Sequence, residues 1–129
     1  MNILRSLAAL LMAIGVGCGA FGAHALKSNL PPERLSKDLA IWDTAVQYNL
    51  VHALAALVFL SLSDRFLSIR AGRTIGLVML ISTSVFSGSL YLLVLTDIRW
   101  LGAITPIGGM GFMIGWSYAA FKLSRQRSN

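Results

Sequence analysis

The stretch IGLVMLISTSVFSGSLYLLVL, residues 75–95, decides the fold of this chain. It places 21 residues without a charged side chain between Arg73 and Asp97. About 20 apolar residues in a helix cross the roughly 30 Å hydrocarbon core of a bilayer. Peptide groups at that depth find no water, so a single spanning segment must be an α-helix. We therefore predict a transmembrane helix over residues 73–96.

Three more apolar stretches of similar length accompany it, and they predict helices at about residues 5–26, 33–62 and 105–123. The composition agrees, because 56% of the 129 residues are hydrophobic and only 12% are charged. Soluble domains carry about 25% charged residues. The sequence thus predicts an all-α, integral membrane four-helix bundle, with residues 1–129 forming a single transmembrane domain.

Two of these segments allow a second interpretation. The first has a basic start at Arg5 and the small-x-small tripeptide Ala23–His24–Ala25, as a cleaved signal peptide would. Its apolar stretch is longer than the usual 7–15 residues, so we favour a retained helix. The fourth helix is expected to start at Thr105 and Pro106, which suit a cap and a first turn. The alternative is a helix from Trp100 that is kinked at Pro106.

Charge asymmetry predicts the orientation of the four helices. With four crossings, the N-terminus, the central loop and the C-terminus share one side, which carries seven Lys and Arg against one acidic residue, or +6. The opposite side carries four basic and four acidic residues, or zero. Positive loops face the cytoplasm. We expect a multi-pass protein of the cell inner (plasma) membrane with both termini cytoplasmic (N-in/C-in). The basic residues lie scattered between apolar stretches, so we expect no nucleic-acid partner.

Glycines recur at helical spacing in the first and fourth segments. Gly15 and Gly19 are four residues apart with Gly22 close to the same face, and Gly111 and Gly115 repeat the spacing. Small residues four apart let the backbones of transmembrane helices approach closely. We predict that these glycines serve helix packing inside the bundle, with a dedicated dimer interface as the alternative.

Polar side chains gather in the outer half of the second predicted helix, and the third predicted helix offers several hydroxyl side chains. Hydrogen bonds between helices would account for them and contribute about 0.6 kcal/mol each. A sharper interpretation is a small polar pocket that opens outward. Its candidate residues are His24, Trp42, Tyr48, Asn49, His52, Ser87 and Tyr91.

The chain offers little for catalysis. It has two histidines, His24 and His52, and one cysteine, Cys18, with no acidic residue close to His52 in the sequence. No nucleophile, base and acid come together in the pattern, so we expect no enzyme. The two histidines are expected at different depths, which disfavours a shared haem or metal ion, and we expect no cofactor.

Several motifs, in order, are similar to one known family. They are GAFGAHAL (residues 19–26), the segment with Trp42, Thr44, Ala45, Tyr48 and His52, FSGSLY (residues 86–91), LGAITPIGG (residues 101–109) and Gly115–Trp116. The chain resembles the uncharacterised inner-membrane family known as domain of unknown function 423, which includes a eukaryotic relative called transmembrane protein 256. The resemblance covers nearly the whole chain. It implies a short multi-helix membrane protein and brings no reaction or ligand.

Three hypotheses about function follow. The first is a structural or accessory helix bundle that acts through partners in the lipid bilayer, as a homo-oligomer or within a larger membrane complex. The second is an oligomeric channel or carrier for a small polar solute. The third, a haem- or metal-binding redox protein, would depend on His24 and His52.

Overall fold

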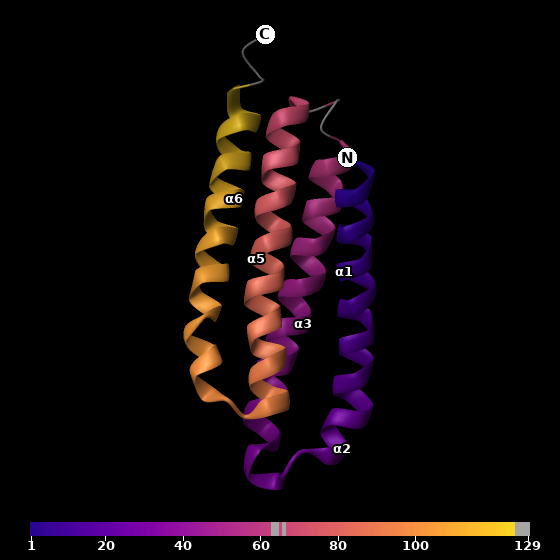
Figure 1. Ribbon diagram of the computed structural model, residues 1–129, viewed down its shortest axis with the longest axis vertical. Helices are drawn as coiled ribbons and strands as arrows, with labels where there is room; N and C mark the ends of the chain where they lie inside the picture. Colours follow the sequence, from indigo (N-terminus) through magenta and orange to yellow (C-terminus); the bar gives the residue numbers. More distant parts are fainter. Residues whose placement is uncertain (63–64, 66, 126–129) are drawn as a thin grey trace.

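The computed structural model describes residues 1–62, 65 and 67–125, which contain helices and no strand. Four long helices run side by side (Figure 1): α1 (Asn2–Phe21), α3 (Pro32–Ser61), α5 (Ile69–Thr96) and α6 (Thr105–Arg125). The predicted all-α bundle of four helices is confirmed. We call the end with Arg5, Arg70, Arg73 and Arg125 the basic end; the connections from α1 to α3 and from α5 to α6 lie at the opposite end.

The connection between α1 and α3 begins with a change of helix type. The π-helical segment η1 (Gly22–Leu26) continues α1, and the short α2 (Lys27–Asn29) follows it. Leu30 is extended, as a residue before proline must be, and a proline occupies the first turn of α3. This break lets the chain reverse its direction across the end of the bundle.

The connection between α5 and α6 is a compact turn. Asp97 ends α5 in the left-handed conformation, with φ of 58°, and its N–H donates to the carbonyl of Leu93. The 3₁₀ segment η2 (Arg99–Ala103) comes next, and α6 starts at Thr105. Residues 99–103 therefore form a separate turn and not the first part of a helix kinked at Pro106.

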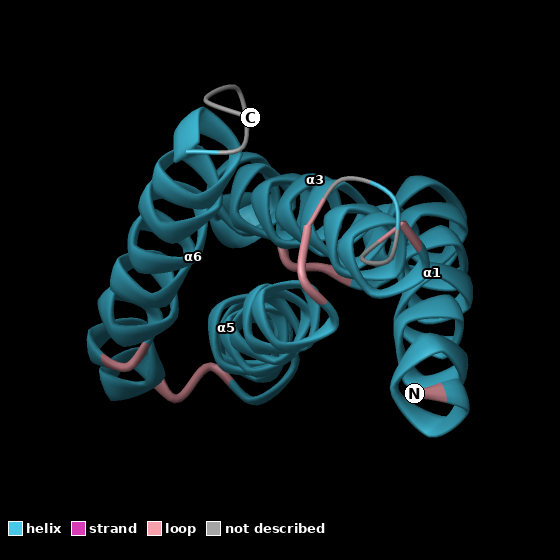
Figure 2. Cartoon of the chain, turned by 90° about the horizontal axis from the view of Figure 1, so that it is seen from above, coloured by secondary structure: helices cyan, strands magenta, loops and turns pink. Residues whose placement is uncertain are grey.

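The helices are not arranged as a closed square. Figure 2 shows α5 in the middle of an arc made by α6, α3 and α1. α1 packs on α3, α6 packs on α5, and α3 and α5 form the central pair. Near the basic end the core includes Leu60, Ile75 and Met79, all fully buried. A second apolar cluster around Trp42 and Leu93 fills the opposite end.

Three helical stretches are long and apolar enough to cross a membrane: Asn2–Asn29, Pro32–Ser61 and Ile69–Thr96. α6 has 21 residues, about 32 Å of helix, but it is not one of the three. Its glycines, its Ser117 and Tyr118 and the charge of Lys122 leave it without a stretch as apolar as the best one in each of the other long helices.

The helices extend beyond the stretches that hydropathy predicted. The first helical run continues to Asn29 instead of 26, and α5 begins at Ile69 instead of 73. Hydropathy marks only the part of a helix that lies in hydrocarbon. Arg70 and Arg73 occupy turns of α5 that continue beyond the hydrocarbon. α3, from Pro32 to Ser61, starts and ends one residue before the predicted segment.

Candidate functional site

One group of polar side chains lies where α3 meets α1 and α5. The indole Nε1 of Trp42, a residue only 2% exposed, donates to the carbonyl oxygen of Cys18 at 2.8 Å. Its ring contacts that of Tyr91 with centroids 4.7 Å apart. On the neighbouring turns, the hydroxyl of Ser87 donates to the carbonyl of Ala45 at 2.8 Å. These contacts join α3 to α1 and to α5. Inside a membrane no water is available to bond these polar groups, so the helices must satisfy one another.

Asn49 is the most buried member of this group, at 1% exposure. Its amide lies 3.3 Å from the Tyr91 hydroxyl. The amide is best satisfied in the orientation that lets its nitrogen donate to the Leu11 carbonyl and its oxygen accept from the Gly15 N–H, each at 3.2 Å. Asn49 thus binds the backbone of α1 directly, which accounts for an amide buried among apolar side chains.

Tyr48 and His52 belong to the other side of α3, facing α6. His52 is buried, and its Nδ1 lies 2.9 Å from the carbonyl of Tyr48. Because a carbonyl only accepts, Nδ1 carries the proton. The imidazole stacks on Phe112 at a centroid distance of 3.6 Å, and Tyr48 stacks on Phe86 at 4.4 Å. A groove of about 620 Å³ opens beside this aromatic group, lined in part by Trp116.

His24 is separate from both groups. It is exposed within η1, at the end of the bundle opposite the basic end. Gly22, which belongs to η1 as His24 does, lies against Trp42 of α3. Trp42 precedes His52 by ten residues, or about 15 Å of helix. The two histidines therefore lie at different levels. Within residues 1–62, 65 and 67–125, no three His, Cys, Asp or Glu side chains are placed to hold a metal ion.

The seven residues of the candidate pocket are thus divided by α3. Trp42, Asn49, Ser87 and Tyr91 share its α1 and α5 side, Tyr48 and His52 share its α6 side, and His24 stands apart. Trp42, Asn49 and Ser87 bond to backbone groups of a neighbouring helix. These three contacts hold α3 against α1 and α5.

The candidate packing glycines all lie at helix contacts. A Cβ built on Gly15 would be 2.8 Å from Leu50 Cδ2, and one on Gly22 would be 2.6 Å from Trp42 Cδ1. Gly19 faces Val46 at 3.4 Å. On α6, a Cβ on Gly111 would meet the hydroxyl of Ser82, and one on Gly115 would lie 2.9 Å from Met79 Cε. A side chain at Gly22 would collide with the rigid indole of Trp42, whereas at Gly15 and Gly115 the nearest atoms are the ends of flexible side chains and at Gly19 the contact is close to an ordinary one.

An ion cluster at the end opposite the basic end was missed by the sequence interpretation. Asp38 of α3 is fully buried, and its two oxygens pair with Arg34 at 2.7 Å and Arg99 at 3.3 Å. Arg34 and Arg99 also contact Asp97. The cluster ties the start of α3 to the end of α5 and to η2. The four-residue spacing of Arg34 and Asp38 was the available signal.

Comparisons with known proteins agree with the membrane architecture. The family model "Protein of unknown function (DUF423)" matches residues 18–109. UPF0382 membrane protein YwdK of Bacillus subtilis (strain 168) is 43% identical over 116 residues, covering 90% of this chain and 91% of the relative. UPF0382 membrane protein SH2409 of Staphylococcus haemolyticus is 41% identical, covering 90% of each chain. No solved structure matches. The predicted resemblance is confirmed, and the chain belongs to the DUF423 family, whose members include proteins named as membrane proteins and have no assigned activity.

Proposed function

We propose that this protein is a non-enzymatic helix bundle of the inner membrane that pairs with a second copy of itself through the outer face of α1. The observation that carries the proposal is a row of small side chains on that face. Ala9, Ala13, Gly17 and Ala20 follow one another at steps of four, four and three, and all four are exposed. A Cβ on Gly17 would meet nothing within 4 Å.

This row differs from the glycines that pack inside the bundle. Gly15 and Gly19 face α3, whereas Ala13 and Gly17 lie more than 100° away around the helix. Of the most apolar part of the first span, 17% is buried within one copy, against 50% for α5. In lipid, exposed leucines need no cover, but a flat row of small residues lets another backbone approach closely.

A second copy fits this face because the row is complementary to itself. Two α1 helices related by a two-fold axis along the membrane normal would place Gly17 against Gly17 and Ala13 against Ala13. Parallel pairing also keeps the basic ends of both copies on one side. The charge asymmetry, +6 against zero, supports the cytoplasm as that side.

A structural or accessory role accounts for the polar groups better than a solute pathway does. Asn49, Ser87 and Trp42 bond to backbone carbonyls or amides of neighbouring helices. Asp38 is neutralised by two arginines. A channel or carrier would need polar groups of this kind to be free for its solute.

Cysteine cross-linking in native membranes tests the proposal. In a Cys18→Ala background, Ala13→Cys and Gly17→Cys are expected to form disulfide-linked dimers on mild oxidation. Ala120→Cys is the matched control, because Ala120 is also small and exposed but lies on α6. Adding Gly17→Leu should abolish the Ala13→Cys dimer, whereas Ala120→Leu should leave it intact. Equal cross-linking from α1 and α6, or none from α1, would refute self-association through this face.

A further inference from the structure

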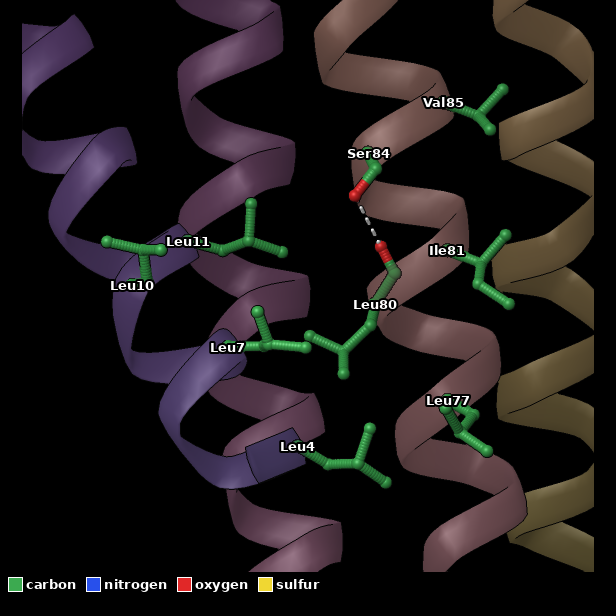
Figure 3. A pocket seen from close by; sticks show the side chains of 9 residues that line it. All are labelled: Leu4, Leu7, Leu10, Leu11, Leu77, Leu80, Ile81, Ser84 and Val85. Atoms are coloured by element: carbon green, nitrogen blue, oxygen red, sulfur yellow. Dashed lines mark hydrogen bonds between the residues drawn. The ribbon is translucent and has the colours of Figure 1, made fainter. Parts of the chain in front are cut away.

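A groove of about 390 Å³ runs between α1 and α5 on the side away from α6. Leucines make up most of its wall, and in Figure 3 Leu4 and Leu7 of α1 point toward α5 while Leu80 points back toward Leu7. Ser84 is the one polar lining residue, and its hydroxyl donates to the carbonyl of Leu80 at 3.0 Å. Apart from the lone pairs of this hydroxyl, the lining side chains offer no hydrogen-bonding group to a polar solute, and the wall suits a hydrocarbon chain.

The length of the groove matches one leaflet of a bilayer. Its lining on α5 extends from Leu77 to Val85, eight steps or about 12 Å. Half of a 30 Å hydrocarbon core is about 15 Å. A second hollow shares Leu11 and Ser84 with the groove and continues along α5 to Tyr91. One acyl chain can lie along this path.

Two arginines stand at the mouth of the groove. Arg70 and Arg73 are exposed and precede Leu77 by seven and four residues. Residues spaced by three and four lie on one face of a helix, so both arginines share the face of α5 that lines the groove. Both also lie in the first turns of α5, where the helix dipole adds partial positive charge. Positive charge beside an apolar cleft between helices suits the headgroup of an anionic lipid.

We infer that the groove between α1 and α5 is a binding site for an anionic phospholipid, with one acyl chain along the leucines and the phosphate against Arg70 and Arg73. The site borders the proposed α1 pairing face but does not require that pairing. Leu4, Leu7 and Leu11 follow one another at steps of three and four on the groove side of α1. Leu10, the fourth lining residue of α1, precedes Gly17 by seven residues and therefore lies on the same side of the helix as the pairing row.

Native mass spectrometry of the full-length protein released from nanodiscs tests this site. The probes are dioleoylphosphatidylglycerol, which is anionic, and dioleoylphosphatidylcholine, which carries no net charge. We expect the anionic lipid to be retained at least fivefold more strongly, since one arginine near the surface contributes about fivefold in affinity. Arg70→Gln with Arg73→Gln should bring retention of the anionic lipid close to that of phosphatidylcholine. Equal retention of the two lipids by the unaltered protein would overturn the inference.

Matched variants separate the site from general effects of charge or size. Lys122→Gln with Arg125→Gln removes two charges from α6 at the same end and should leave retention unchanged. Ser84→Trp fills the groove and should abolish binding of both lipids, whereas Ile114→Trp on the exposed face of α6 should not. Circular dichroism establishes that each variant is folded. Equal loss in the Lys122 and Arg125 variant, or lipid retained by a folded Ser84→Trp protein, would contradict the assignment.

Discussion

The close approach of α6 to α5 depends on Gly108, because its missing side chain faces backbone atoms. A Cβ built there would lie 2.6 Å from the amide nitrogen of Phe86 and 2.9 Å from its Cα. Carbon atoms in ordinary contact are about 3.5–4.0 Å apart, so Gly108→Ala requires α6 to move outward by about 1 Å. Overpacking of this kind costs about 1–3 kcal/mol.

Gly109 provides a matched control one residue further along the helix. A Cβ there would lie 3.7 Å from Phe86 Cε2, which is normal van der Waals contact. Both substitutions gain the same helix propensity, about 1 kcal/mol, so this gain cancels when the two variants are compared. Gly108→Ala should therefore be less stable than Gly109→Ala by about 1–3 kcal/mol, or roughly 5- to 150-fold in the unfolding equilibrium.

The measurement is reversible unfolding of the full-length variants in mixed micelles, with rising dodecyl sulfate and helicity followed by circular dichroism. The midpoint should move to a lower dodecyl sulfate fraction for Gly108→Ala and stay or rise for Gly109→Ala. If Gly108→Ala were as stable as Gly109→Ala, the described contact between α5 and α6 would be wrong.

Two further substitutions test the polar contacts with the same unfolding assay. Asp38→Asn should destabilise the protein by about 1–3 kcal/mol, because it removes the negative charge that pairs with Arg34 and Arg99. Asp43→Asn, at an exposed position of the same helix, is the control and should change stability little. Equal effects of the two substitutions would contradict the ion cluster. Asn49→Leu should cost about 0.6–1.7 kcal/mol through lost bonds to α1 and α5. Gln47→Leu, also exposed, is its control, and a more stable Asn49→Leu protein would argue against the hydrogen bonds.

Hydropathy and helix signals predicted the number and order of the helices, because solvation by lipid is a property of each segment by itself. The start of α6 was predictable for the same local reason, since Pro106 suits a first turn. The ends of α1 and α5 were less predictable, because charged residues can continue a helix into the aqueous interface. The π-helical segment Gly22–Leu26, whose first residue lies against the indole of Trp42, left no local signal in the sequence.

The polar group could be located on its helix but not assigned to its neighbours. Trp42 and Asn49 are seven residues apart and Tyr48 and His52 are four apart, but Asn49 and His52 are only three apart, so spacing alone did not divide the group between two faces of α3. Which helix each face meets is set by the arc of α1, α3 and α6 around α5, and that arrangement is tertiary. Asp38 was counted only among the charges of the side opposite the termini, yet folding buries it between Arg34 and Arg99.

The account of four crossings is tested most directly at α6, because α6 lacks a stretch as apolar as those of the other three long helices. Single cysteines at Ala103, before α6, and at Arg125, its last residue, can be placed in a Cys18→Ala background; both positions are exposed. Labelling with a membrane-impermeant maleimide is then compared in right-side-out and inside-out vesicles. We predict that position 103 reacts only in right-side-out vesicles and position 125 only in inside-out vesicles. Reaction of both positions from the same side would contradict the four crossings and the shared cytoplasmic location of the two termini.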